Sequence, residues 1–200
     1  MGKNQYFLLF AVTQRKIKGY FWATNSQYRR NAMPHPKVQV VIFAASGQVL
    51  LLQTTTIRGA FWQNVTGSVE SHEDYTAAAA RELAEETSFT TPVRSAHYGF
   101  QFEHPSYQDP TQQEICTEQV FYTLLPTPQS PRLDPLEHQT FSWRNLTEVA
   151  AQDYKFATSW TALSQAYEIC RREHPELAWP YNAHLNDPLP TQPINTKINV

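Results

Sequence analysis

Apolar and polar positions repeat with two different periods along this chain, and the two periods divide it into strands and helices. Residues 38–45 (VQVVIFAA) form an apolar, β-branched run, and residues 49–56 (VLLLQTTT) follow after a Ser-Gly-Gln turn. Short apolar runs bounded by turn residues are typical of strands, so this pair predicts a β-hairpin. Four more stretches predict strands: 61–67, 93–104, 117–125 and 138–146.

Two segments carry the longer spacing of a helix. The first runs from Ser71 to Glu86, where Ser71 and Asp74 predict a capping box and the alanines at 77–80 have high helix propensity. The second covers about residues 153–174 and is amphipathic. Its apolar side chains recur every three or four positions: Trp160, Leu163, Ala166, Tyr167 and Cys170.

Both ends of the chain differ from this patterned centre. Residues 1–36 hold six basic side chains and no acidic one. At Met33 the sequence MPHPKVQVVIFA resembles an ordinary protein start, so we expect a basic N-terminal extension that need not belong to the native chain. A targeting segment and an added strand are the alternatives. Residues 176–200 are rich in proline and predict a flexible tail, which leaves 37–175 as a single domain.

Composition narrows the classes of function. An apolar fraction of 41% with 13% aromatic residues is enough for a hydrophobic core. The net charge of −2 gives no general attraction to nucleic acid or to anionic membranes. The early apolar run at residues 6–12 is too short to cross a bilayer, and the two cysteines lie outside any CxxC pair. We therefore expect a cytoplasmic protein that binds neither nucleic acid nor membrane.

The densest negative charge lies near the end of the first predicted helix. Glu85 and Glu86 lie three and four positions after Glu82, so all three share one helix face. Their mutual repulsion and the negative end of the helix dipole both oppose this arrangement. A hard cation would offset that cost, because Mg²⁺ takes its oxygen ligands from a few carboxylates and from substrate phosphates. For three glutamates alone, a solvated acidic face is the alternative.

The spacing around this cluster follows a longer pattern. Gly67 is followed after five residues by Glu73, and Glu73 after seven residues by the run RELAEE at 81–86. This pattern resembles the signature of the Nudix family, G-x5-E-x7-R-E-U-x-E-E-x-G-U, in which U is apolar. Eight of the nine specified positions match over 23 residues, and Ser88 stands where the signature has its second glycine.

The resemblance implies an α/β (α+β) Nudix fold, in which a mixed β-sheet is sandwiched between helices. It also implies hydrolysis of a nucleoside diphosphate linked to another group, with Mg²⁺ (or Mn²⁺) as cofactor. Glu82, Glu85 and Glu86 are then the catalytic metal ligands, while Gly67 turns the chain tightly and its carbonyl can face the metal. Glu73, expected one turn into the helix, and Arg81, expected to pair with Glu85 or Glu73, have structural roles.

Residues 37–172 resemble one branch of the family, the dihydroneopterin triphosphate pyrophosphatases, most specifically at FWQNVTGSVE. This resemblance implies that the substrate is a pterin or nucleoside triphosphate, that pyrophosphate is released, and that the pathway is folate synthesis. It adds Glu137 to the metal ligands and to the catalytic set. It also implies that Thr66, His138 and Ser159 lie near the substrate.

The chain departs from that branch at three places. The branch has an arginine after the residue matching Gln53, where this chain has threonines, and Arg58 is the candidate that replaces it at a phosphate. Lys37, ahead of the first strand, is a further candidate substrate contact. Ser88 replaces a glycine at a left-handed helix end, at a cost of about 1 kcal/mol, so the turn there can differ. The loop at 105–116 is shorter than in that branch.

Three functions are therefore open. The first is Mg²⁺-dependent hydrolysis of dihydroneopterin triphosphate, and also of nucleotides such as dATP, with Glu82 or Glu137 as general base. The second is hydrolysis of another nucleotide or of a sugar nucleotide, because an arginine is missing and a loop is short. The third is a binding module of Nudix fold without catalysis, against which the complete set of glutamates argues.

Overall fold

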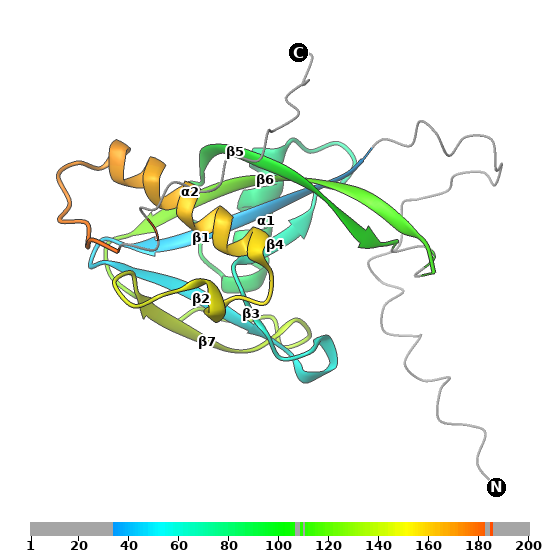
Figure 1. Cartoon of the computed structure of the whole chain (residues 1–200), viewed down its shortest axis with the longest axis horizontal. Helices are drawn as coiled ribbons and strands as arrows, with labels where there is room; N and C mark the ends of the chain where they lie inside the picture. The colour runs from blue at the N-terminus through cyan, green and yellow to red at the C-terminus, as the bar shows by residue number, and fades with distance from the viewer. Residues whose placement is uncertain (1–33, 107–108, 110, 183–184, 186–200) are drawn as a thin grey trace, which may run out of the picture. The chain divides into compact units, whose positions relative to one another are not determined.

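A mixed β-sheet lies between two helices in the computed structural model, which describes residues 34–106, 109, 111–182 and 185 (Figure 1). In that part of the chain the strands are β1 His35–Ala44, β2 Gln48–Thr54, β3 Trp62–Gln63, β4 Val65–Ser68, β5 Arg94–Pro105, β6 Gln113–Leu125 and β7 His138–Asn145. The helices are α1 Tyr75–Thr87 and α2 Ala157–Glu173, with short 3-10 turns η3 Thr56–Arg58 and η4 Ala151–Asp153. The predicted fold class is confirmed. Residues 1–33 of the predicted extension lie outside the described residues.

The sheet divides at its central strand, β1. One edge of β1 pairs with β6 in parallel over all ten residues, and β5 continues the sheet beyond β6. The other edge is shared, because β4 pairs antiparallel with Lys37–Val40 and β2 pairs antiparallel with Phe43 and Ala44. The predicted hairpin is therefore present but brief. β3 and β7 both pair with β2 and form a separate branch of the sheet.

Alternate residues of β1 pack under different helices, as the period of a strand requires. Val40 and Ile42 belong to a buried cluster with Leu83 of α1. Val41 and Phe43 belong to a second cluster, which includes the buried face of α2. The continuous apolar run of β1 thus reflects burial on both faces of the sheet.

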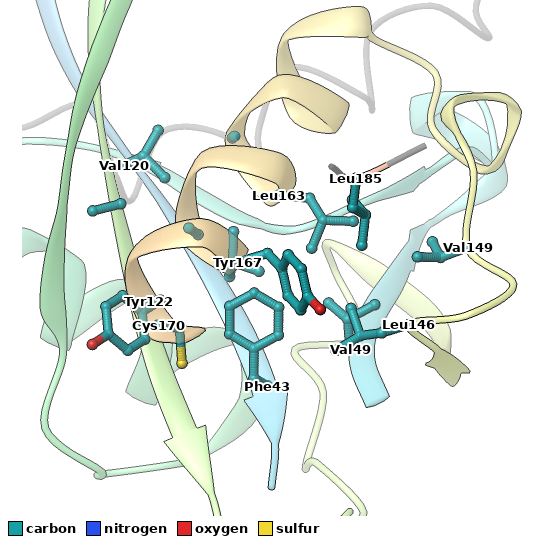
Figure 2. Close-up of a cluster of buried hydrophobic side chains, with 14 of the residues drawn as sticks. Phe43, Val49, Val120, Tyr122, Leu146, Val149, Leu163, Tyr167, Cys170 and Leu185 are labelled. Atoms are coloured by element: carbon teal, nitrogen blue, oxygen red, sulfur yellow. The ribbon is translucent and has the colours of Figure 1, made fainter. Parts of the chain in front are cut away.

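The side chains predicted for the buried face of α2 do face the sheet. Figure 2 shows Tyr167 and Cys170 of this helix beside Phe43 and Tyr122, and Leu163 beside Leu185. The rings of Phe43 and Tyr167 have centroids 6.4 Å apart. The helix begins at 157 rather than 153, because the preceding residues form the separate turn η4. Neither helix of the described chain is long and apolar enough to span a bilayer.

Residues after α2 also pack on this core, which the sequence did not predict. The ring of Trp179 meets that of Phe43 edge-on, with centroids 6.1 Å apart. The amide of Asn182 donates to two backbone carbonyls, at 2.6 and 3.0 Å. The flexible tail predicted from residue 176 is therefore wrong for these positions, and residues 186–200 lie outside the described residues.

The stretch 61–67, predicted as one strand, is two short strands with Asn64 between them. β3 pairs with β2, whereas β4 pairs with β1. The Asn64 side chain donates to the carbonyl of Ser159 at 3.3 Å and accepts from the hydroxyl of Tyr154 at 3.1 Å. These bonds hold the chain where it crosses from one branch of the sheet to the other.

The start of α1 differs from the prediction. Asp74 is its N-cap, and the Asp74 carboxylate accepts from the backbone N–H of Ala77 at 2.8 Å, so Ser71 does not cap the helix. Glu73 consequently lies before the helix and not one turn into it. The predicted capping box and the predicted position of Glu73 are both wrong, because Asp74 satisfies the helix N-terminus alone.

The end of α1 keeps the left-handed turn of the signature despite Ser88. This residue has φ 61° and ψ 16°, and its N–H donates to the carbonyl of Ala84 at 2.8 Å. The turn that could have differed is thus formed with a serine. Its side chain bears the steric cost that glycine would avoid.

Ser88→Gly is expected to raise the free energy of unfolding by about 0.5–1 kcal/mol, since it relieves the left-handed strain but adds entropy to the unfolded chain. Urea unfolding of both proteins measures the difference. Ser88→Ala is the matched control, because it keeps the Cβ atom and should give no gain. Equal stability of the glycine and alanine variants would contradict the strain assigned to Ser88.

Candidate functional site

Glu82 lies directly against the backbone of Gly67. A Cβ atom added to Gly67 would stand 1.9 Å from the carboxyl carbon of Glu82, far inside any real contact. Gly67 itself lies within β4, opposite Val38, and is not among the glycines of positive φ. The tight turn predicted for it is therefore wrong. Glycine is needed here because the carboxyl group of α1 occupies the space of a side chain.

Arg81 holds the acidic end of the signature together. Its guanidinium donates to Glu73 at 2.7 and 3.2 Å, to Glu82 at 2.7 Å and to Glu85 at 3.3 Å. It also donates to the carbonyl of Ser68 at 2.8 Å, which ties α1 to β4. The hydrogen bond from Arg81 holds the pKa of Glu73 below its usual value. The predicted pairing of Arg81 with Glu73 and Glu85 is present.

Among the carboxyl groups of the cluster, that of Glu86 is the most deeply buried, and few polar contacts offset the cost of burying it. Its side chain is 2% exposed, and neither carboxyl oxygen has a well-aligned hydrogen-bond partner, although the backbone of Thr66 and the charge of Arg58 act to lower its pKa. Burial raises the pKa of Glu86 well above its usual value, and the nearby carboxylates of Glu137 and Glu82 raise it further. A buried carboxyl group without partners is costly, so this arrangement favours a bound positive charge.

His138 is a polar neighbour of Glu86, but it does not supply that charge. Its Nε2 atom lies 3.7 Å from a Glu86 oxygen, and burial lowers the pKa of His138 to about 4. The ring is therefore neutral at neutral pH. The amide nitrogen of Gln63 lies 3.5 Å from the same Nε2 atom, so Nε2 faces both Gln63 and Glu86.

Glu137 reaches the cluster from outside α1, as the sequence implied. It precedes β7, and it is close enough to Glu86 to raise the pKa of that carboxyl group. Its carboxylate pairs with the guanidinium of Arg58 at 3.0 Å. Arg58, which ends η3, thereby stands beside the acidic cluster, and its predicted contact with a phosphate stays a prediction.

The remaining predicted site residues lie away from the buried carboxyl groups, either in solvent or on the other face of the sheet. Glu85 turns outward with 43% of its side chain exposed. Thr66, on β4, is paired with a residue on the α2-facing side of the sheet. Ser159 of α2 and Lys37 of β1 also lie on that side. Their predicted roles at the substrate are thus compatible with a part of the substrate beyond the phosphates.

The carboxylates fit a hard cation, although they are not preassembled around one. Among the described residues, no three His, Cys, Asp or Glu side chains lie gathered closely enough to hold a metal ion. Two features nevertheless match the predicted Mg²⁺ (or Mn²⁺) site: the buried carboxyl oxygens of Glu86 without partners, and the fit of Glu82 against Gly67. Oxygen donors of this kind are what these ions prefer. Glu82 and Glu86, with Glu137, are therefore the residues that would hold the ion.

Three polar residues escaped the sequence reasoning. Gln63 contacts His138, while Gln39 and Glu118 lie buried on the sheet with 1% and 4% of their surface exposed. The signal for Gln39 was its polarity within the apolar run of β1. Glu118 carried no comparable signal, because it stands at the polar start of TEQVFYTLL.

One family model and one curated protein match most of this chain. The family model described as NUDIX domain matches residues 33–163. The octanoyltransferase of Myxococcus xanthus is 34% identical over 140 residues, which are 68% of this chain and 38% of that protein. The chain thus spans well under half the length of this curated relative.

Two solved structures have a fold similar to that of this chain. The dihydroneopterin triphosphate pyrophosphohydrolase of E. coli is 28% identical with a TM-score of 0.57, covering 67% of this chain and 97% of that one. The binary complex of the C. elegans Ap4A hydrolase is 20% identical with a TM-score of 0.53, covering 69% and 98%. The second likeness concerns the fold alone.

Proposed function

The chain belongs to the Nudix family, and from this premise we propose that it releases pyrophosphate from a pterin triphosphate, dihydroneopterin triphosphate, with dATP-like nucleotides as weaker substrates. As a Nudix hydrolase it acts on a phosphoanhydride. The observation that carries the proposal is the buried, unpartnered carboxyl group of Glu86 beside Glu82 and Glu137. A cation and a polyphosphate together would satisfy that group.

Each residue at the cluster has a definite task in this reaction. Glu82 and Glu86, with Glu137, would hold the ion, and Arg81 fixes the carboxylate of Glu82 against Gly67. Bound Mg²⁺ would neutralise phosphate charge and lower the pKa of a coordinated water. Arg58 provides a further positive charge to the phosphates. Glu82 or Glu137 accepts the proton of the attacking water.

The proposed substrate is supported by the similarity to a solved enzyme structure as well as by the site. The E. coli enzyme with 28% identity matches over 97% of its length, and its name specifies dihydroneopterin triphosphate. The segment FWQNVTGSVE of this chain, which resembles that branch, forms β3 and β4. These strands place Gly67 beside the glutamates and Thr66 on the opposite face. A triphosphate at the glutamates can therefore extend past β4.

A comparison of substrates tests the proposal. With Mg²⁺ present, kcat/KM is measured for dihydroneopterin triphosphate, dATP, a dinucleoside polyphosphate and a sugar nucleotide. We expect pyrophosphate from the pterin substrate, with kcat/KM at least about tenfold above the others, a margin typical of one matched buried contact. Cleavage of the sugar nucleotide alone would contradict the substrate and leave the family membership intact.

A further inference from the structure

Two adjacent rows of side chains cross the sheet on the side that α2 covers. Each row takes one residue from β5, β6, β1 and β4, because directly paired residues point to the same face. The inner row is Tyr98, Val120, Gln39 and Thr66. The outer row is Phe100, Glu118, Lys37 and Ser68. Both rows end on β4, the strand that carries Gly67 and contacts the acidic cluster.

The helix α2 covers the inner row and leaves the outer row beyond its end. The Ser159 hydroxyl, in the first turn of α2, accepts a hydrogen bond from Nε2 of Gln39 at 3.1 Å. Tyr167, about two turns later, lies over Phe43. The helix therefore runs in the direction of β1, and Glu118 and its neighbours lie past the helix N-terminus.

Two polar side chains in these rows are buried. Gln39 is 1% exposed, and its Oε1 atom is buried without a hydrogen bond. Glu118 is 4% exposed and lies directly opposite Lys37 of β1; burial raises the pKa of Glu118 to about 7, and the charge of Lys37 acts in the opposite direction. Buried polar atoms are nearly always hydrogen-bonded in folded proteins. The unsatisfied acceptor of Gln39, next to the buried carboxyl group of Glu118 on the neighbouring strand, therefore points to a ligand.

Aromatic rings on β5 border this polar pair. The ring centroids of Tyr98 and Phe100 are 5.9 Å apart, and those of Phe100 and Phe102 are 5.8 Å apart. All three rings are half-buried, so each keeps part of its surface accessible. Such a row offers a planar heterocycle a surface on which to stack.

We propose that Glu118 and Gln39 bind the heterocycle of the substrate and select a 2-amino-4-oxo-pyrimidine edge, which pterins and guanine share. That edge presents two adjacent N–H donor groups, the ring N–H and the amino group, to the acceptors of Glu118 and Gln39. Adenine presents one amino group beside a ring nitrogen that is itself an acceptor. Adenine would leave one of the two buried acceptors unsatisfied.

This inference rests on the proposed function, which places the triphosphate at Glu82 and Glu86. From β4 to β6 is two strand spacings, or about 10 Å. A sugar or a short hydroxylated side chain can bridge that span between the phosphates and the ring. Glu118 lies at the outer row and is reached first, and Gln39 lies deeper beneath α2.

The test measures binding without catalysis, so that it does not depend on the metal site. Neopterin, GMP, IMP and AMP are titrated against the full chain in EDTA, by calorimetry or by pterin fluorescence. We expect neopterin or GMP to bind at least about tenfold more tightly than IMP, which lacks the amino group, and than AMP. Comparing neopterin with GMP shows whether the site prefers a pterin or guanine, which present the same edge.

Glu118→Gln is expected to remove this preference, because it replaces one acceptor by a donor of the same shape. Glu103→Gln, the same change at an exposed position on β5, is the matched control and should keep the preference. Gln39→Leu should also lose it, while Gln39→Glu, which restores an acceptor, should retain part of it. Circular dichroism and urea unfolding confirm that each variant is folded.

The outcomes separate this inference from the proposed function. If pyrophosphate is released from the pterin substrate and Glu118→Gln keeps the wild-type preference, the inference is overturned and the function stands. If the wild-type chain cleaves no triphosphate yet binds GMP in a Glu118-dependent manner, the inference stands and the proposed function fails. Equal binding of GMP and AMP by the wild type would also overturn the inference.

Discussion

Glu86→Gln is expected to lower kcat by about 10³-fold while the protein stays folded. Loss of one central ligand removes several kcal/mol of transition-state stabilisation, and about 4 kcal/mol corresponds to that factor. The fold should not suffer, because both carboxyl oxygens of Glu86 are buried without partners. A neutral amide of the same shape is cheaper to bury than a carboxylate.

The measurement combines steady-state pyrophosphate release under Mg²⁺ with urea unfolding in the same buffer without metal. We expect the free energy of unfolding of Glu86→Gln to equal or exceed that of the wild type. Glu103→Gln on β5 is the control for the substitution itself and should retain wild-type kcat. An unchanged kcat in Glu86→Gln would refute the assignment of Glu86 to the metal.

Gly67→Ala has the second largest expected effect, on both activity and stability. The added Cβ atom would lie 1.9 Å from the Glu82 carboxyl carbon and 2.0 Å from its Oε1 atom, so the side chain must move. That movement breaks the 2.7 Å ion pair between Glu82 and Arg81. We expect kcat to fall by about 10²-fold and stability by about 1–3 kcal/mol, the usual cost of overpacking.

A double-mutant cycle with Glu82→Ala identifies the cause. Once the carboxyl group is gone, a methyl group at Gly67 has space, so Gly67→Ala should cost much less stability in that background. The coupling is expected to exceed about 1 kcal/mol in urea unfolding. Additive costs would show that Gly67 is required for its backbone and not for the space that Glu82 occupies.

Local periodicity explains most of what could be predicted. Two features depend on neighbours in sequence and could therefore be predicted. They are the apolar runs of β1 and β2, and the spacing of Leu163, Tyr167 and Cys170 in α2. The residues at which helices and strands begin and end were harder to predict. Asp74 in place of Ser71 caps α1, because the cap depends on the path of the preceding chain.

The acidic signature in α1 also contains features that the sequence predicted and features that it could not predict. Its spacing placed Glu82, Glu85 and Glu86 on one face, and Arg81 was expected to pair with Glu85 or Glu73, both of which it contacts. It could not tell that Glu86 is buried while Glu85 is exposed, because that depends on which strands lie over each turn. The roles of these glutamates as ligands stay predictions.

The sequence by itself determined the strands, the helices and the spacing of the acidic cluster, since all three follow from contacts within a few turns or residues. Only the tertiary structure placed Glu137 and Arg58 beside Glu86, pressed Glu82 against Gly67, and set Gln39 and Glu118 on neighbouring strands. Those contacts join residues far apart in the chain. They depend on strand register and on packing between elements, and a local pattern carries no record of either.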